Sequence, residues 1–273
     1  MPSPAQESIT AALFLSGLAA IFTFFHLKRN EKTTQSKKVP TYSVVSLPYM
    51  ATESGEVENK VSRDVIHYPL QHLADKFSGR ETFPSPLLVR VWPKNLNFVS
   101  RTHEVLESQL VSPGGSPQEV RAFVRSGPHE RLFFDPKVVK AAVVTCGGLC
   151  PGLNTVIREI VMCLSNVYGC SEVYGVVNGY CGFYNGIPWK RLTPTSVEEI
   201  HEHGGTVLGS SRGGFDLDKI LDSIVEKGIN QLFILGGDGT HRGAQALVNG
   251  ANSRGLCLSV IGVPKTIDND IGL

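Results

Sequence analysis

The sequence predicts an α/β fold, a parallel sheet with helices on both faces, preceded by an irregular N-terminal extension. Short apolar runs such as Val138–Thr145 and Gln231–Leu235 are typical of strands that are buried on both faces of a sheet. Between such runs lie segments of helical period, among them Asp216–Lys227, whose apolar residues recur at helical spacing. Strands that alternate with helices in this way form parallel sheets covered on both sides.

The predicted strands and helices alternate from residue 132 onward. Asp216 is placed to cap the helix that begins there, and Gly228 is placed to end it. The expected strands are Val138–Thr145, Glu172–Val177, Gln231–Leu235 and Leu258–Val263, with another beginning at Thr206–Gly209; the expected helices are Asn154–Leu164, Thr195–His203, Asp216–Lys227 and Thr240–Asn249.

The 273 residues divide into three regions. Residues 1–38 contain Ile9–Leu27, an uncharged apolar run near the length of a membrane span, with basic residues after it. We interpret it first as a signal anchor that leaves the rest of the chain in the cytoplasm, and second as an atypical targeting segment, for example to plastids. A start with neither role is the third interpretation. Residues 39–131 are broken by prolines into the irregular extension, where Leu87–Trp92 fits a strand, and residues 132–273 form the α/β domain.

Composition narrows the classes of partner. The formal net charge of +1 gives no general reason to expect nucleic acid as a ligand. The six cysteines include no CxxC pair and no zinc-type spacing with histidine, so we interpret them as buried, reduced thiols. Any preference for anions must therefore come from local sites.

Two glycine-rich loops at the ends of predicted strands suit phosphate, because ligands of such sheets bind where strands end. The glycines of Gly147–Asn154 (GGLCPGLN) admit a phosphate close to the backbone, next to the N–H groups of a helix N-terminus. This loop lacks the Lys-Ser/Thr of a Walker A motif and the spacing of a dinucleotide-binding loop. In Gly209–Phe215 (GSSRGGF), Arg212 stands among small residues, so its planar guanidinium can reach a phosphate.

Two further loops carry acids. In Gly236–Thr240 (GGDGT), glycines surround Asp238, whose carboxylate can hold Mg²⁺ together with phosphate oxygens. In Pro264–Asp270 (PKTIDND), Asp268 follows a predicted strand and can accept the proton of an attacking hydroxyl. Each motif alone is also explained by an ordinary turn. Together, the four loops predict phosphoryl transfer, whose catalysis consists mostly of positioning and charge stabilisation.

These motifs, in this order and rough spacing, resemble the phosphofructokinase family, and RSGPHERLFFDP (Arg125–Pro136) resembles its plant-type group. The resemblance covers roughly the second half of the chain and implies an incomplete first domain of that Rossmann-like fold. It implies a glycolytic kinase that transfers phosphate from ATP to the 1-hydroxyl of fructose 6-phosphate, with Asp268 as general base and Asp238 on Mg²⁺. The full-length form is expected to be a homo-oligomer. The resemblance assigns ATP to Gly148, Arg212, Gly213, Gly237, Asp238, Gly239 and Thr240, and the sugar phosphate to Thr266, Ile267, Asp268 and Asp270.

Two positions bear on the choice of phosphoryl donor. In this family, users of pyrophosphate carry aspartate in place of Gly239 and lysine at the position of Lys265. Gly239 favours ATP, since it leaves room for the α-phosphate and does not repel it, whereas Lys265 favours pyrophosphate. We give Gly239 more weight because it acts through both volume and charge, and we keep a pyrophosphate-dependent enzyme as an alternative.

The family's sequence continues beyond PKTIDND into a second domain, whereas this chain ends at Leu273. We therefore expect little or no activity from the 273-residue chain alone. A non-catalytic, nucleotide-binding regulatory chain is a further alternative. NAD kinases and diacylglycerol kinases, which have a loop like GGDGT, are a minor one because they lack the other motifs in this order.

Overall fold

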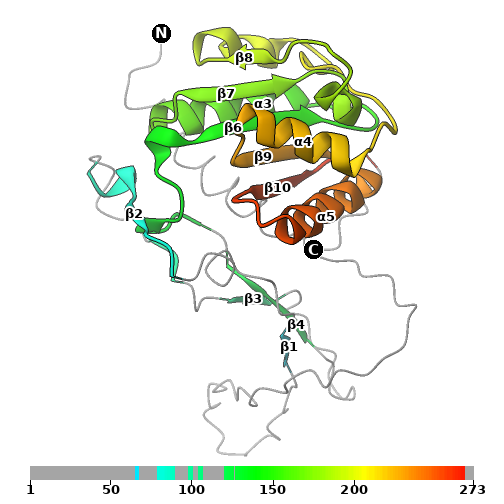
Figure 1. Cartoon of the computed structure of the whole chain (residues 1–273). Helices are drawn as coiled ribbons and strands as arrows, with labels where there is room; N and C mark the ends of the chain where they lie inside the picture. Colours follow the sequence, from blue (N-terminus) through cyan, green and yellow to red (C-terminus); the bar gives the residue numbers. More distant parts are fainter. Residues whose placement is uncertain are drawn as a thin grey trace, which may run out of the picture.

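A computed structural model describes residues 65–67, 79–89, 98–100, 104–106, 120–125 and 127–267. Its largest sheet has five strands among these residues, in the order β10-β9-β6-β7-β8 (Figure 1). Their bounds are β6 Lys140–Thr145, β7 Glu172–Val176, β8 Lys190–Leu192, β9 Gln231–Gly236 and β10 Ser259–Pro264. The first four in spatial order run parallel, and β8 runs antiparallel to β7. The expected α/β sheet is thus confirmed, with one antiparallel edge strand.

Helices cover both faces of this sheet. They are α3 Leu153–Met162, which continues into a π turn at Cys163–Val167, α4 Leu217–Lys227 and α5 Asp238–Ser253. Helix α3 packs on one face, whereas α4 and α5 pack together on the other (Figure 1). Strands β6 and β9, inside the sheet, are therefore buried on both faces, as their continuous apolar sequences predict.

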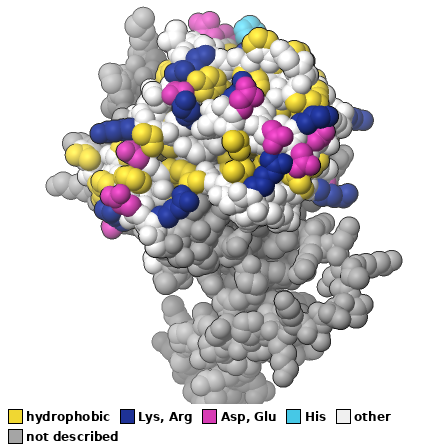
Figure 2. Space-filling view, in the orientation of Figure 1, with side chains coloured by type: hydrophobic (Ala, Val, Ile, Leu, Met, Phe, Trp, Pro, Cys, Tyr) yellow, Lys and Arg dark blue, Asp and Glu magenta, His cyan; other side chains and the backbone are white. Residues whose placement is uncertain are grey.

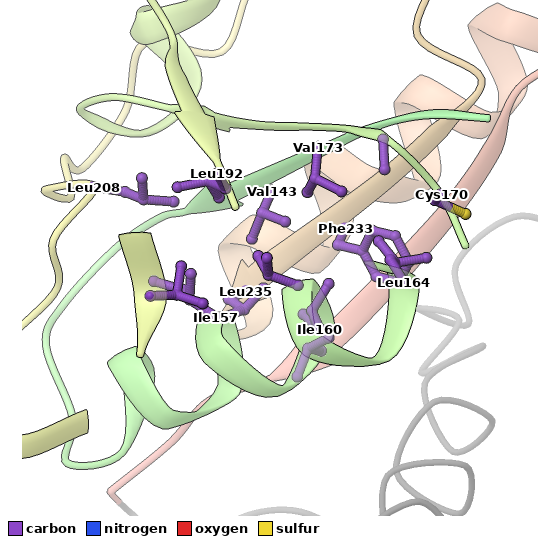
Figure 3. Close-up of a cluster of buried hydrophobic side chains, with 14 of the residues drawn as sticks. Val143, Ile157, Ile160, Leu164, Cys170, Val173, Leu192, Leu208, Phe233 and Leu235 are labelled. Carbon is purple, nitrogen blue, oxygen red and sulfur yellow. The ribbon is translucent and has the colours of Figure 1, made fainter. Parts of the chain in front are cut away.

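Alternate residues of β6 point into two different cores. Val143 joins Ile157 and Ile160 of α3 in one buried cluster, together with Leu235 of β9 (Figure 3). Val144 belongs to a second cluster, which contains the apolar residues of α4 and α5. A strand alternates its side chains between the faces of a sheet, so a strand that is apolar throughout serves both cores.

Helix α4 begins and ends where its local signals place it. The Oδ1 atom of Asp216 accepts a hydrogen bond of 3.2 Å from the backbone N–H of Lys219, which caps the N-terminus. Gly228 has a φ of 66° and its N–H donates to the last carbonyls of the helix. Arg254 joins α4 from the end of α5 by ion pairs of 2.6 Å with Asp218 and Asp222. On the face shown in Figure 2, acidic and basic side chains are interspersed.

Three expected elements are wrong. Thr206–Gly209 forms a turn, not a strand, because the carbonyl oxygen of Gly209 accepts a hydrogen bond from Thr145 and Leu208 is buried without strand pairing. Thr195–His203 forms two 3₁₀ turns, Thr195–Val197 and Ile200–Glu202, in place of one α-helix. Pro86–Leu88 is a 3₁₀ turn capped by the Ser85 hydroxyl, so the first residues of the expected strand Leu87–Trp92 do not form one; residues 90–97 lie outside the described part.

Short strands precede the main sheet. Strands β1 Val65–His67, β4 Val120–Val124 and β3 Glu104–Leu106 form one small sheet in that spatial order, and β2 Phe83–Pro84 pairs with β5 Arg131–Leu132. The predicted divisions at residues 38 and 131 remain predictions. Ile9–Leu27 lies outside the described residues; among those that are described, every helix is too short or too polar to cross a membrane.

Candidate active site

The predicted motif loops meet at one edge of the sheet, where β6, β9 and β10 end. Because these strands are adjacent and parallel, the residues that follow them emerge side by side. The N–H of Cys146 donates to Leu235 at 2.8 Å, and the N–H of Lys265 donates to Gly236 at 2.9 Å. The backbone ladder thus extends just past the strands and aligns the loops.

The first loop, between β6 and α3, depends on glycine at both ends. Gly147 has a φ of 82° and Gly152 a φ of 87°, a left-handed region that other residues rarely adopt. Gly152 occupies the N-cap of α3 and offers no side-chain hydrogen bond to it. The N-terminal N–H groups of α3 are therefore not capped by that residue, which is a favourable setting for an anion.

The second loop is joined to the first by reciprocal hydrogen bonds. The hydroxyl of Ser210 donates to the carbonyl oxygen of Gly147 at 2.7 Å, and the N–H of Gly147 donates to the carbonyl oxygen of Ser211 at 2.9 Å. The Ser211 hydroxyl donates in turn to the carbonyl oxygen of Asn178 at 2.7 Å. Asn178 has a φ of 68°, the sole positive value found at a described non-glycine residue. These contacts fix the backbone on which Arg212 stands.

Arg212 and Lys265 converge on Gly148. A Cβ atom built on Gly148 would lie 3.7 Å from Nη2 of Arg212 and 3.9 Å from Nζ of Lys265. Two cationic groups from different loops therefore share one small volume beside a residue that has no side chain. A guanidinium and an ammonium so placed suit the oxygens of a phosphate group. Gly213, the next predicted residue, is exposed and has a φ of 76°.

The third loop places an acid at the start of a long helix. Gly237 is the N-cap of α5 without a side-chain cap, and Asp238 is the first residue of that helix. The side chain of Asp238 is exposed, and no ion pair within the described residues engages it. A Cβ built on Gly239 would have no described atom outside its own helix and chain neighbours within 4 Å. As far as the described residues go, the N-terminus of α5 is therefore open on the side where Asp238 and Gly239 lie.

Thr240 holds the first turn of α5 in place from its buried side. It is 7% exposed, and its side chain packs so closely on Gly236 that a Cβ there would lie 2.4 Å from its Oγ1 atom. The hydroxyl of Tyr180 donates to the carbonyl oxygen of Thr240 at 2.7 Å. One residue further, Nδ1 of His241 lies 3.0 Å from the carbonyl oxygen of Gly237, and burial lowers the pKa of that imidazole.

The fourth loop is described only in its first part. Lys265 and Thr266 are half-buried, and Ile267 is 74% exposed. A cavity of about 210 Å³ lies between this segment and the first loop, lined chiefly by residues 150–153 and 263–266. Asp268 and Asp270, the predicted base and its neighbour, lie outside the described residues.

Within the described part of the four motif loops, Asp238 is the one acidic side chain that could bind a metal ion. Among the described residues there is no group of three or more His, Cys, Asp or Glu side chains that could hold one. Mg²⁺ commonly binds through one or two carboxylates, together with water and substrate phosphates. Asp238, exposed beside the open end of α5, is suitably placed for that mode of binding.

Sequence patterns did not identify several residues that build the site. Asn178 and Tyr180 lie outside the predicted motifs, and the Asn-Gly pair at Asn178 signals only a turn. Ser210 and Ser211 lie within a recognised motif, but their partners are over 30 residues away in sequence. Such contacts have no local signature.

Comparison with known proteins places these motifs in a family. Residues 140–273 match the family model for phosphofructokinase. The chain is 46% identical over 209 residues to ATP-dependent 6-phosphofructokinase 7 of Arabidopsis thaliana, covering 73% of this chain and 41% of that protein. It is 50% identical over 206 residues to ATP-dependent 6-phosphofructokinase 4, chloroplastic, of the same plant, covering 74% and 38%. The chain thus spans about two fifths of the length of these relatives.

A solved structure with partial likeness is that of Pichia pastoris phosphofructokinase in the T-state. The TM-score is 0.44 at 26% identity, and the match covers 57% of this chain and 18% of that one. The family assignment rests on the sequence matches.

Proposed function

Since residues 140–273 belong to the phosphofructokinase family, we propose that this chain carries the ATP side of a 6-phosphofructokinase active site. The reaction is transfer of the γ-phosphoryl group of ATP to the 1-hydroxyl of fructose 6-phosphate. Its products are ADP and fructose 1,6-bisphosphate. The names of the two plant relatives, both ATP-dependent 6-phosphofructokinases, support this choice of substrates.

The convergence of Arg212 and Lys265 on Gly148 is the observation that carries the proposal. Two cations near one glycine, beside the open N-terminus of α5, supply charge and N–H donors for a chain of phosphates. Transfer of a phosphoryl group needs mostly such positioning and charge compensation. The residues proposed to contact ATP are Gly148, Arg212, Gly213, Gly237, Asp238, Gly239 and Thr240.

The acceptor side is proposed from the fourth loop. Thr266, Ile267, Asp268 and Asp270 are assigned to fructose 6-phosphate. The carboxylate of Asp268 takes the proton of the 1-hydroxyl as that oxygen bonds to the γ-phosphorus, and the bond to the leaving ADP oxygen breaks. Asp238 would hold Mg²⁺, which neutralises phosphate charge when it is bound.

Pyrophosphate remains the second candidate donor, because Lys265 lies in the same volume as Arg212. The open space at Gly239 supports ATP, since a nucleotide needs room beyond its terminal phosphates. An aspartate there would add both volume and negative charge. Gly239→Asp should therefore weaken ATP binding more than pyrophosphate binding.

The decisive experiment is calorimetric titration of the purified 273-residue chain with Mg-ATP and, separately, with Mg-pyrophosphate. We expect binding of ATP that strengthens with Mg²⁺ and is competed only weakly by pyrophosphate. Preference for pyrophosphate would reassign the donor, and absence of binding to both would refute the proposal. Transfer is tested on the full-length form, by fructose 1,6-bisphosphate formation with NAD offered as a competing acceptor. Phosphorylation of NAD alone would also refute the proposal.

Location and assembly complete the proposal. We assign the protein to the cytoplasm. A plastid form is the alternative, because one of the plant relatives is named chloroplastic. The full-length form is proposed to be a homo-oligomer. Light scattering of that form and imaging of a tagged protein would test the two assignments.

A further inference from the structure

Tyr180 connects two loops of the candidate site without belonging to either. It lies in a 3₁₀ turn, Gly179–Phe183, that follows β7, and its side chain is 4% exposed. Its hydroxyl donates a buried hydrogen bond of 2.7 Å to the carbonyl oxygen of Thr240, in the first turn of α5. Burial raises the pKa of Tyr180, so this hydroxyl keeps its proton and remains a donor.

The ring of Tyr180 makes a second connection. It packs edge-to-face with Phe215, with ring centroids 5.1 Å apart and an angle of 81° between the planes. Phe215 is the last residue of the loop Gly209–Phe215, which carries Arg212. Gly243 of α5 permits this arrangement, because a Cβ there would lie 2.9 Å from the Tyr180 hydroxyl and 3.0 Å from the Phe215 ring.

We propose that Tyr180 is a positioning residue of the donor site, which fixes the first turn of α5 and with it the carboxylate of Asp238. The hydroxyl restrains the turn through Thr240, two residues after Asp238, and the ring restrains the Arg212 loop through Phe215. This inference rests on the proposed function, because it takes Asp238 to be the residue that holds Mg²⁺. Tyr180 itself need not touch the nucleotide.

Removing only the Tyr180 hydroxyl should lower the affinity for Mg-ATP and leave the affinity for magnesium-free ATP nearly unchanged. In Tyr180→Phe, the affinity for Mg-ATP should fall about 3- to 10-fold, the size expected for one buried hydrogen bond. The affinity for ATP measured in EDTA should change by less than about twofold, since Arg212 and Lys265 remain in place. Tyr174→Phe is the matched control: its hydroxyl donates to Glu172 at 2.8 Å on β7, and neither affinity should change.

Amide exchange tests the restraint without a ligand. The N–H of His241 donates to the carbonyl oxygen of Gly237 at 3.0 Å and closes the first turn of α5. Its exchange should be about fivefold faster in Tyr180→Phe, because that turn opens locally more often. The amide of Ile220, which closes the first turn of α4 by a bond of 3.0 Å to Asp216, should be unaffected.

The two affinities and the exchange rate together decide whether Tyr180 is a positioning residue. Loss of Mg-ATP affinity alone, with faster exchange at His241, supports the inference. Equal loss of the affinities for Mg-ATP and for magnesium-free ATP would show that Tyr180 has a merely structural role. No loss of either affinity would show that it has no role in the donor site. Either result would overturn the inference. If the unsubstituted chain gains no affinity from Mg²⁺, the proposed function fails, and unchanged exchange at His241 would then separately overturn the role of Tyr180.

Discussion

The hydroxyl of Ser210 donates a hydrogen bond of 2.7 Å to the carbonyl oxygen of Gly147, 63 residues earlier in the chain. The N–H of the same glycine donates to Ser211, so the two loops are joined in both directions. Arg212 follows directly, and Gly148 follows Gly147. The distance between the guanidinium and Gly148 is therefore controlled by a backbone connection, not by the flexible arginine side chain alone.

Ser210→Ala should weaken ATP binding severalfold through loss of this connection. The lost hydrogen bond should lower the free energy of unfolding by about 1 kcal/mol, measured by urea unfolding, with affinity measured by calorimetry. Ser196→Ala is the matched control, since its hydroxyl also donates to a carbonyl, that of Thr193, at 3.0 Å, outside the turn Gly179–Phe183 that carries Tyr180. A similar stability loss with unchanged affinity is expected there. Equal affinity losses in both variants would contradict the role given to Ser210.

Arg212→Ala and Lys265→Ala should each weaken ATP binding by about 10-fold or more, because each removes a charge-assisted hydrogen bond. Stability should change little, by about 0.5 kcal/mol or less. If both cations contact one phosphate group, the double variant should depart from additivity by about 0.5 kcal/mol or more. Lys137→Ala, at an exposed residue before β6, should leave affinity unchanged. Strict additivity would place the two cations on separate groups.

Gly236→Ala and Gly239→Ala should have opposite effects although they lie in one motif. A Cβ on Gly236 would lie 2.4 to 2.5 Å from atoms of the Thr240 side chain, so overpacking should cost about 1–3 kcal/mol in the free energy of unfolding. A Cβ on Gly239 meets no described atom outside its own helix and chain neighbours, and alanine favours the helix, so stability should hold or rise slightly. Thermal unfolding of both variants measures this. Similar destabilisation at both positions would be evidence against the geometry of this turn.

The sequence predicts best those elements whose capping residues and apolar pattern lie within or next to the element itself. Helix α4 has an acid at its N-cap, a glycine at its end and an apolar stripe between them, and its observed bounds agree with these signals. The error at Thr206–Gly209 has the opposite cause. Its apolar residues suit a strand, but Thr145 engages the Gly209 carbonyl from a distant part of the chain. Strand β8, Lys190–Leu192, is short, charged and mostly exposed, so no apolar pattern indicates it.

The features of the candidate site also fall into two groups, those that local motifs indicate and those that they do not. Glycine motifs at strand ends predict phosphate loops, and their convergence follows once β6, β9 and β10 are neighbours. Strand order is a property of the whole sheet, and no single motif encodes it. The contact between Tyr180 and Thr240 spans 60 residues and depends on Gly243 for space. The sequence therefore indicates which loops come together better than it indicates which residues hold them in place.

The free energy of unfolding should fall as the pH rises above about 9, and Cys146 should account for part of that fall. Burial raises the pKa of the Cys146 thiol from 9.0 to about 12. In the unfolded chain the thiol ionises near pH 9, whereas the folded chain keeps the proton until about pH 12. Between these values the folded state binds more protons than the unfolded state, so stability decreases with rising pH. Cys163 and Cys170 act in the same direction, with pKa values raised to about 12 and about 11.

Urea unfolding under reducing conditions at about pH 8 and about pH 10.5 measures this dependence. Cys146→Ala should be less stable than the unsubstituted chain at the lower pH, because it leaves a small cavity in the core. It should then lose less stability between the two pH values, since one titrating thiol is gone. Val144→Ala, a cavity on the same strand with no titrating group, should retain the full pH dependence. If Cys146→Ala retains it too, the pKa of the Cys146 thiol is not raised in the folded chain as argued.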